Sequence, residues 1–247
     1  MGCKDYNLFC CCCGNASRSK LKPMSILLLG LESSGKTEIG HLIVKKQRQN
    51  FDSTNGVQNF TFNNHSFTIN ITEVGGNKEM QKLWHHYFIK TMAIVYCYDM
   101  SSSPSEMENS FKVFNTLISN EYVRGKPILI VGTKADLVTY NVESYDIENM
   151  FELEKLANIF GSKLKVCQNS SLDHDDLSSG CLWLEDELNR DYKCLKNRLK
   201  LDKHQSSKKH RKRLSYWFTR KKIHSELNSS KRPKTAPTIS KTILLYS

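Results

Sequence analysis

The chain has 247 residues, of which 39% are hydrophobic and 10% aromatic, so it can form one domain of about 150 to 200 residues with extensions. Its formal net charge of +11 is unevenly distributed. From Arg190 to the end there are eighteen Lys and Arg against three Asp and Glu, which leaves a net charge of −4 on the preceding residues. The positive charge therefore belongs to the C-terminal region and not to the globular part.

Cysteine placement and hydropathy exclude two classes of protein. Five of the nine cysteines lie in the first thirteen residues and the other four are scattered, which is unlike a secreted disulfide framework. The chain contains no run of about 18 apolar residues that could span a bilayer, and its N-terminus lacks the basic-then-apolar layout of a signal peptide. These features predict a protein that faces the cytosol.

The predicted elements alternate between strands and helices. In chain order they are a strand over 23–30, a helix over 37–47, a hairpin of strands 57–62 and 67–72, a helix over 77–88, a strand over 93–98, a helix over 104–120, a strand over 127–131, a helix over 146–160, a strand over 163–167 and a long helix from about 180 to 201. This order predicts an α/β fold, with a mostly parallel six-stranded sheet, helices on both faces and the hairpin near one edge. We expect three regions: a cysteine-rich segment over 1–22, the globular domain over 23–201 and a basic, disordered tail over 202–247.

The strongest motif joins the first predicted strand to the first predicted helix. It matches the pattern G-x-x-x-x-G-K-[ST], and its residues are Gly30, Leu31, Glu32, Ser33, Ser34, Gly35, Lys36 and Thr37. In such a loop consecutive backbone N–H groups point at phosphate oxygens, Lys36 contacts the β and γ phosphates, and the Thr37 hydroxyl can ligate magnesium. The alternative is a chance match in a Ser- and Gly-rich turn. The predicted strand before the motif and the predicted helix after it argue against this alternative.

A second motif follows the apolar strand that ends near Gly132. The residues Thr133, Lys134 and Asp136 are similar to the Asn-Lys-x-Asp element with which GTPases recognise guanine. An aspartate at this position accepts two hydrogen bonds from guanine N–H donors, a pattern that adenine does not offer. The alternative is an ordinary polar turn after a strand.

Together these motifs resemble the ADP-ribosylation-factor-like (ARF-like) GTPases over roughly residues 24–198. The loop at 30–37 is similar to the family's G-L-D-x-x-G-K-T, residues 83–88 to its L-W-x-x-Y-[FY], and residues 72–76 to its W-D-x-G-G. The resemblance implies a P-loop small-GTPase domain with GTP or GDP and Mg²⁺ as cofactors. It also implies effector or regulatory proteins as partners at the two switch regions.

The resemblance assigns further roles by position. Thr54 lies where the family's T-x-G switch is expected, so its hydroxyl would bind magnesium and its backbone would contact the γ-phosphate. The N–H group of Gly76 would contact the same phosphate from the other side. Ser171 falls in the family's last guanine-contacting loop.

Two positions depart from the family pattern. Glu73 replaces the aspartate that holds magnesium through water, and its extra methylene shifts the carboxylate by more than about an ångström, which a rigid octahedral shell tolerates badly. Asn77, the candidate catalytic residue, replaces the glutamine that orients the attacking water and is one methylene shorter. Positioning is most of this catalysis, so we expect slow GTP hydrolysis.

Both termini predict contact with a membrane. The adjacent thiols of Cys10, Cys11, Cys12 and Cys13 are too crowded for a zinc site, which favours S-palmitoylation; an unmodified leader is the alternative. The basic tail, with aromatics between its cations, is expected to support binding to anionic lipid, although such a run can also be only a solvated segment. We therefore expect the protein at the cytoplasmic face of a membrane.

Within the family, the cysteine-rich start and the long basic tail are most similar to the protein 13 subgroup, which is associated with cilia. That similarity implies the ciliary membrane as a location and another ARF-like GTPase as a partner. It also raises an alternative function, a pseudo-GTPase scaffold or an exchange factor for another small GTPase. A nucleic-acid-binding function could be argued from the basic run at 208–213, but no base-reading module accompanies that run, so nucleic acid is not an expected partner.

Overall fold

The structure is a computed structural model that describes residues 21–44, 56–63, 67–138, 147–149 and 151–230. The chain divides into a compact unit that extends to Asp202 and a second unit that begins at Lys203. Each unit is described by itself.

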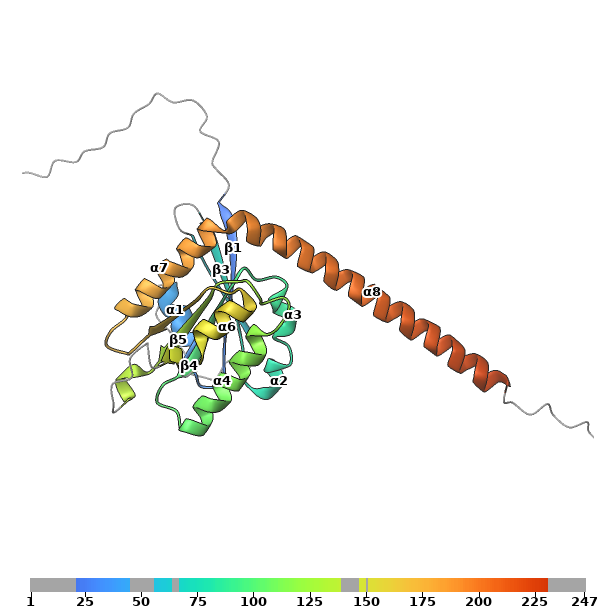
Figure 1. The fold of residues 1–247 in the computed structure, drawn as a ribbon, viewed down its shortest axis with the longest axis horizontal. Helices are drawn as coiled ribbons and strands as arrows, with labels where there is room; N and C mark the ends of the chain where they lie inside the picture. Colours follow the sequence, from blue (N-terminus) through green and yellow to red (C-terminus); the bar gives the residue numbers. More distant parts are fainter. Residues whose placement is uncertain (1–20, 45–55, 64–66, 139–146, 150, 231–247) are drawn as a thin grey trace, which may run out of the picture. The chain divides into compact units, whose positions relative to one another are not determined.

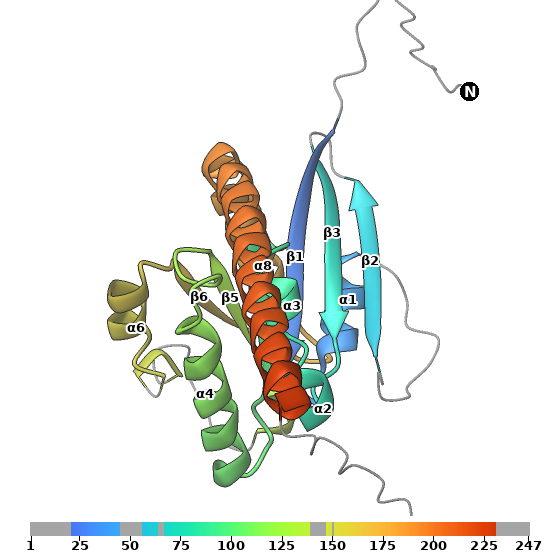
Figure 2. The same ribbon diagram turned by 90° about the vertical axis from the view of Figure 1, so that its right-hand side faces the viewer.

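Among the described residues, six strands form one sheet in the order β2-β3-β1-β4-β5-β6 (Figures 1 and 2). The strands are β1 (Lys22–Gly30), β2 (Val57–Asn63), β3 (Phe67–Val74), β4 (Ala93–Asp99), β5 (Ile128–Thr133) and β6 (Leu164–Gln168). Only the β2–β3 pair is antiparallel, and it lies at one edge. The predicted α/β fold class, with a mostly parallel sheet and an edge hairpin, is confirmed.

Helices cover both faces of this sheet. The described helices are α1 (Lys36–Ile43), α2 (Lys78–Gln81), α3 (His85–Phe88), α4 (Pro104–Ile118), α6 (Leu153–Phe160), α7 (Asp175–Arg190) and α8 (Tyr192–Ser230), with a short 3-10 helix η1 over Ala135–Leu137. Of α8, only the part up to Asp202 belongs to the first unit. Side chains of β1 alternate between two cores, as strand geometry requires. Met24, Ile26 and Leu28 pack with α1 and α7, whereas Leu27 and Leu29 pack with α4 and α6.

The helix predicted over 77–88 is instead two four-residue helices. The residues between them form tighter turns, in which the N–H groups of Leu83 and Trp84 donate to carbonyls three residues earlier. The break brings the buried indole Nε1 of Trp84 within 3.0 Å of the Gly75 carbonyl oxygen, to which it donates. Burying the Trp84 side chain with its N–H group hydrogen-bonded thus stabilises the fold more than a continuous helix over these residues would.

The helix predicted over 146–160 is also interrupted. Glu152 has a φ of 49°, and α6 begins only at Leu153. The interruption lets Phe151, which is 2% exposed, pack against the rings of Tyr98 and Phe114, both 5.5 Å away between centroids. Aromatic packing thus determines where this helix starts.

The C-terminal region differs most from expectation. The helix predicted from about 180 to 201 is two helices, α7 and α8, that meet at Asp191. Residues 203–230, which the sequence pattern places in a disordered tail, continue α8 as helix. Lys, Arg, Leu and Gln residues in this segment have high helix propensity. Helical backbone is therefore favoured there even without an apolar face that packs against a core.

We expect Ser103→Ala to lower the free energy of unfolding by about 1 kcal/mol, because Ser103 caps α4. Its hydroxyl oxygen accepts from the Glu106 N–H (3.4 Å), and the Glu106 carboxylate accepts from the Ser103 N–H (3.0 Å). Chemical denaturation measures the difference. The matched control is Ser178→Ala at an exposed position of α7, which should be neutral or slightly stabilising. Equal effects of the two changes would show that the cap contributes nothing.

Candidate functional site

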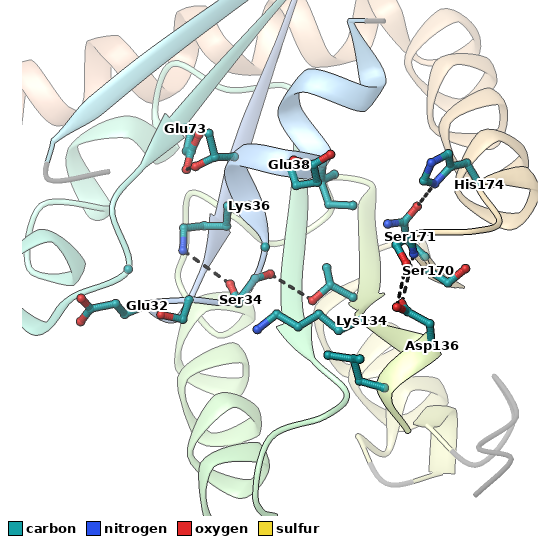
Figure 3. A pocket seen from close by; sticks show the side chains of 18 of the residues that line it. Glu32, Ser34, Lys36, Glu38, Glu73, Lys134, Asp136, Ser170, Ser171 and His174 are labelled. Carbon is teal, nitrogen blue, oxygen red and sulfur yellow. Dashed lines mark hydrogen bonds between the residues drawn. The ribbon is translucent and has the colours of Figure 1, made fainter. Parts of the chain in front are cut away.

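A cavity of about 480 Å³ opens at the carboxyl ends of the parallel strands (Figure 3). Most of the predicted site residues line it, namely Glu32, Ser33, Ser34, Gly35, Lys36, Thr37, Glu73, Gly76, Asn77, Thr133, Lys134, Asp136 and Ser171. Gly30 and Leu31 do not line the cavity, and Thr54 lies outside the described residues. Residues separated by more than 130 positions in the sequence therefore share one pocket.

The loop between β1 and α1 forms one wall of this cavity. Ser33 and Gly35 have φ angles of 60° and 71°, so the chain curls through the left-handed region just before the helix. No side chain caps α1, which leaves the first N–H groups of the helix available to an anion. The loop therefore has the backbone geometry of a phosphate-binding cradle.

Lys36 places a cation inside this cradle. Its side chain is largely buried, and Nζ donates to the Leu31 carbonyl oxygen at 2.5 Å and lies 3.5 Å from Ser34 Oγ. Burial lowers the pKa of Lys36 below its usual value, while nearby Glu73 and Glu32 oppose that shift. A phosphate group beside Lys36 would satisfy the buried charge.

Gly76 brings the end of β3 against the same loop. A Cβ atom at this position would lie 2.3 Å from the Leu31 carbonyl carbon and 2.5 Å from the Glu32 nitrogen. Gly30 is equally constrained, because a Cβ atom there would lie 2.2 Å from the Cys97 carbonyl oxygen. Glycine at both positions permits these close backbone approaches.

Thr37 and Glu73 meet between the loop and the end of β3. The Thr37 hydroxyl donates to Glu73 Oε1 at 2.7 Å, and Glu73 is fully buried. Hydroxyl and carboxylate oxygens are the ligands that Mg²⁺ prefers. The described residues contain no group of three or more His, Cys, Asp or Glu that could hold a metal ion alone. The residues present thus fit an ion held by one or two protein oxygens together with phosphate oxygens.

Thr133 connects the two ends of the cavity. Its hydroxyl lies 3.2 Å from the Ser34 carbonyl oxygen in the loop and 3.1 Å from the Tyr98 carbonyl oxygen at the end of β4. Although Thr133 departs from the Asn of the guanine motif, its shorter side chain still links the phosphate loop to β5.

Lys134 follows Thr133 in a left-handed conformation, with φ at 57°. Its Nζ donates to Asp99 Oδ2 at 2.5 Å. Burial acts to raise the pKa of Asp99, but hydrogen bonds from Lys134 and Ser101 outweigh it, so the net shift is downward. The ion pair fixes a lysine at the rim of the cavity.

Asp136 is held from the opposite side of the cavity by Ser171. The Ser171 N–H donates to Asp136 Oδ1 at 3.1 Å, and the Ser171 hydroxyl donates to Oδ2 at 2.7 Å (Figure 3). These hydrogen bonds lower the pKa of Asp136, so the carboxylate stays ionised and accepts further hydrogen bonds. Neighbouring Ser170 instead hydrogen-bonds within its own loop, to the N–H groups of Leu172 and Asp173.

Sequence reasoning missed several cavity residues. His174 and Asn169 line the pocket, and His174 Nδ1 lies 2.8 Å from Asn169 Oδ1. Glu38, Ile39 and Leu137 also contribute. No motif contains these five residues. Folding alone places the loop after β6 beside the 3-10 helix η1.

Two further expectations concern other parts of the chain. The cysteines from Cys10 to Cys13 lie outside the described residues. Within the described ranges, no helix has the length and apolar character needed to cross a bilayer.

Comparison with known proteins gives a family for this fold and cavity. A model of the ADP-ribosylation factor family matches residues 14–188. ADP-ribosylation factor-like protein 13B of Chlamydomonas reinhardtii is 27% identical over 173 residues, which are 69% of this chain and 32% of that protein. ADP-ribosylation factor-like protein 14 of Mus musculus is 29% identical over 151 residues, 58% of this chain and 75% of that protein. The chain thus spans about a third of the length of the first of these relatives.

A similar solved structure is the Arl6 BBS3 small GTPase from Trypanosoma brucei with bound nucleotide analogue GppNp. The TM-score is 0.60 at 20% identity, and the match covers 68% of this chain and 99% of that one, which shows the same fold. The matched family model covers well over half of the sequence. The chain belongs to the ADP-ribosylation factor family of small GTPases.

Proposed function

We propose that the protein is a membrane-associated guanine-nucleotide-binding switch whose GTP-bound surface acts on partners, and that it hydrolyses GTP slowly. Membership of the family supports GTP or GDP as the ligand. The observation that carries the proposal is Asp136, an ionised carboxylate held by two hydrogen bonds from Ser171 in the same cavity as Lys36.

Guanine selectivity follows from the position of Asp136. Asp136 lines a cavity whose other wall is the phosphate cradle, so a nucleotide would span between them. A carboxylate can accept from both N1–H and N2–H of guanine, whereas adenine lacks that donor pair. Ser171 would keep the carboxylate oriented for the base.

We expect Asp136→Asn to weaken GDP binding and shift preference toward xanthosine diphosphate, because the amide no longer offers two acceptors. The loss for GDP should be about 10²-fold or more. Competition against a fluorescent nucleotide measures it. Asp186→Asn, at an exposed position of α7, serves as the matched control and should leave GDP affinity unchanged. Equal affinity of the parent protein for ATP and GTP would refute guanine specificity.

Magnesium would be held by Thr37 and Glu73 together with the nucleotide phosphates. Bound there, the ion would neutralise charge between the β and γ phosphates. Glu73 is longer than the family's aspartate, yet it accepts a hydrogen bond from Thr37, which supports a site that retains the ion with altered affinity. Thr54 would complete the site from the first switch.

Slow hydrolysis is supported by the environment of Asn77. Its Oδ1 accepts from the Met80 N–H at 2.8 Å and caps α2, so this oxygen is engaged in the helix cap. An amide used as a cap, one methylene shorter than the family's glutamine, is badly placed to orient water. Asn77 thus stabilises the start of α2 and does not align the attacking water.

Asn77→Gln is expected to raise single-turnover GTP hydrolysis by between about 10- and 100-fold, because the longer amide can reach the attacking water. Asn77→Ala is the matched control and should hydrolyse GTP no faster than the parent. If the parent already turns over GTP at the rate of an efficient, activator-stimulated GTPase, another group positions the water.

A pseudo-GTPase scaffold, or an exchange factor for another ARF-like GTPase, is the second candidate. The departures from the family pattern at Glu73 and Asn77 favour this candidate, because both are expected to slow GTP hydrolysis while leaving nucleotide binding possible. Measured rates of nucleotide exchange and hydrolysis separate it from a timed switch. Similarity to the protein 13 subgroup supports the ciliary membrane as the place of action for either candidate.

Membrane association would use both ends of the chain. Palmitoylation at Cys10, Cys11, Cys12 and Cys13 would supply the anchor, because two or more acyl chains hold a protein stably where one does so only reversibly. Helix α8 adds basic side chains, among which Lys208, Lys209, Arg211 and Lys212 are exposed. Each basic residue near an anionic leaflet contributes about 1 kcal/mol.

Replacing Cys10, Cys11, Cys12 and Cys13 with Ser is expected to move the protein from the membrane pellet to the soluble fraction of cells. The control is Cys194→Ser, because Cys194 is an exposed cysteine on α8 that the anchor does not use. Cell fractionation and acyl-exchange labelling give the two readouts. A quadruple variant that remains in the pellet would contradict acylation as the anchor.

A further inference from the structure

A buried charged cluster fixes the first turns of α8 to the domain. Tyr192 and Leu195 of this helix are 8% and 6% exposed and pack in the core beside β1. Asp202, about two turns beyond Leu195 on α8, is 4% exposed, and Lys126, in the turn before β5, is 1% exposed. Two opposite charges are therefore buried where α8 meets the domain, away from the nucleotide cavity.

Lys126 contacts two elements at once. Its Nζ donates to the carbonyl oxygen of Phe88, the last residue of α3, at 2.7 Å, and lies 3.8 Å from Asp202 Oδ2. Burial lowers the pKa of Lys126 to about 8, although the charge of Asp202 opposes that shift. The loss of either partner would leave a buried ammonium group poorly satisfied.

Arg198 extends the cluster along α8. Its Nε lies 3.3 Å from Asp202 Oδ1, and its Nη2 donates to the Glu121 carbonyl oxygen at 2.8 Å. Asp202 is thus shared between a buried lysine of the domain and an arginine of its own helix. The attachment of α8 is specific in geometry and charge.

Helix α3 connects this cluster to the nucleotide cavity. Trp84, at the start of α3, donates from its buried indole nitrogen to the carbonyl oxygen of Gly75 at 3.0 Å. Gly75 precedes Gly76, which lies against the phosphate loop. A continuous series of contacts therefore runs from Gly75 through Trp84, Phe88 and Lys126 to Asp202.

We propose that this series couples the bound nucleotide to the attachment of α8. The proposal rests on the function proposed above and on the contact between Gly76 and the γ-phosphate that the family resemblance implies. When GTP replaces GDP, a movement at Gly75 would displace Trp84 and α3. Packed elements change between discrete arrangements, so the contact between Phe88 and Lys126 would differ between the two states.

The coupling has a reciprocal consequence. If the nucleotide changes how firmly residues 192–202 are held, a partner that holds α8 changes the nucleotide affinity by the same factor.

Hydrogen exchange of the full chain tests the coupling. We expect amides within residues 192–202 to exchange at rates that differ at least about fivefold between the GDP-bound protein and the protein bound to a non-hydrolysable GTP analogue. Trp84→Phe keeps an aromatic side chain but removes the indole N–H group. Asp202→Asn keeps a side chain of nearly the same shape but removes its charge. Each change should reduce the difference to less than about twofold.

The matched control is Lys163→Met. Lys163 also forms two ion pairs, with Glu187 of α7 and with Asp191, the residue that caps the C-terminus of α7, but it lies outside the series. This variant should therefore keep the full difference between nucleotides. If Asp202→Asn fails to fold, as judged by thermal unfolding, Trp84→Phe decides the result.

Equal exchange with both nucleotides bound would overturn the coupling, and so would a difference that persists in Trp84→Phe and Asp202→Asn. Nucleotide occupancy is measured on the same samples. A chain that binds neither nucleotide overturns the proposed function together with the coupling, whereas full occupancy without a difference in exchange overturns the coupling alone.

Discussion

The parallel pairing of β1 with β3 and β4 is the constraint on which the site depends. Because parallel strands end at the same edge of a sheet, the loops after β1, β3, β5 and β6 meet there, although they are far apart in the sequence. The Thr133 hydroxyl then links the phosphate loop at Ser34 to the guanine-motif loop after β5. Without that register, neither motif alone would form a cavity of nucleotide size.

Close backbone approach is the second requirement of this arrangement. At Gly30 and Gly76 a methyl group would overlap neighbouring backbone atoms, so both positions require glycine for space, and Gly30, with a φ of 152°, requires it for conformation as well. The same approach places the end of β3 directly beside the phosphate loop. Because Gly76 packs so closely against the phosphate loop, a shift of either one at the γ-phosphate position would also move the segment that follows Gly76, which begins with Asn77 and α2.

Much of the fold was predictable from local sequence. The apolar runs of β1, β4 and β5 indicate buried parallel strands, and alternation over 57–62 and 67–72 indicates the hairpin. The phosphate loop and Asp136 were found because their chemistry requires fixed residue types at fixed spacing. These are features that a few neighbouring residues decide.

The remainder depends on contacts between distant residues. The helix predicted over 77–88 breaks because the Trp84 indole reaches Gly75, and the helix predicted over 146–160 breaks where Phe151 packs against aromatic rings of β4 and α4. His174 enters the cavity only because the sheet brings the β6–α7 loop beside η1. The continuation of α8 beyond Asp202 was missed because a run of like charge indicates disorder in isolation, although its residues favour helix.

The departures at Glu73 and Asn77 change the interpretation of the family resemblance. Glu73 still accepts a hydrogen bond from Thr37, the residue proposed to bind magnesium with it, whereas Asn77 caps a helix. The geometry therefore supports nucleotide binding but not rapid hydrolysis. Mass spectrometry of the nucleotide released from purified protein, before and after magnesium chelation, tests this most directly. We expect guanine nucleotide at close to one per chain, released faster after chelation. Adenine nucleotide in its place, or no bound nucleotide under either condition, would contradict guanine-nucleotide binding.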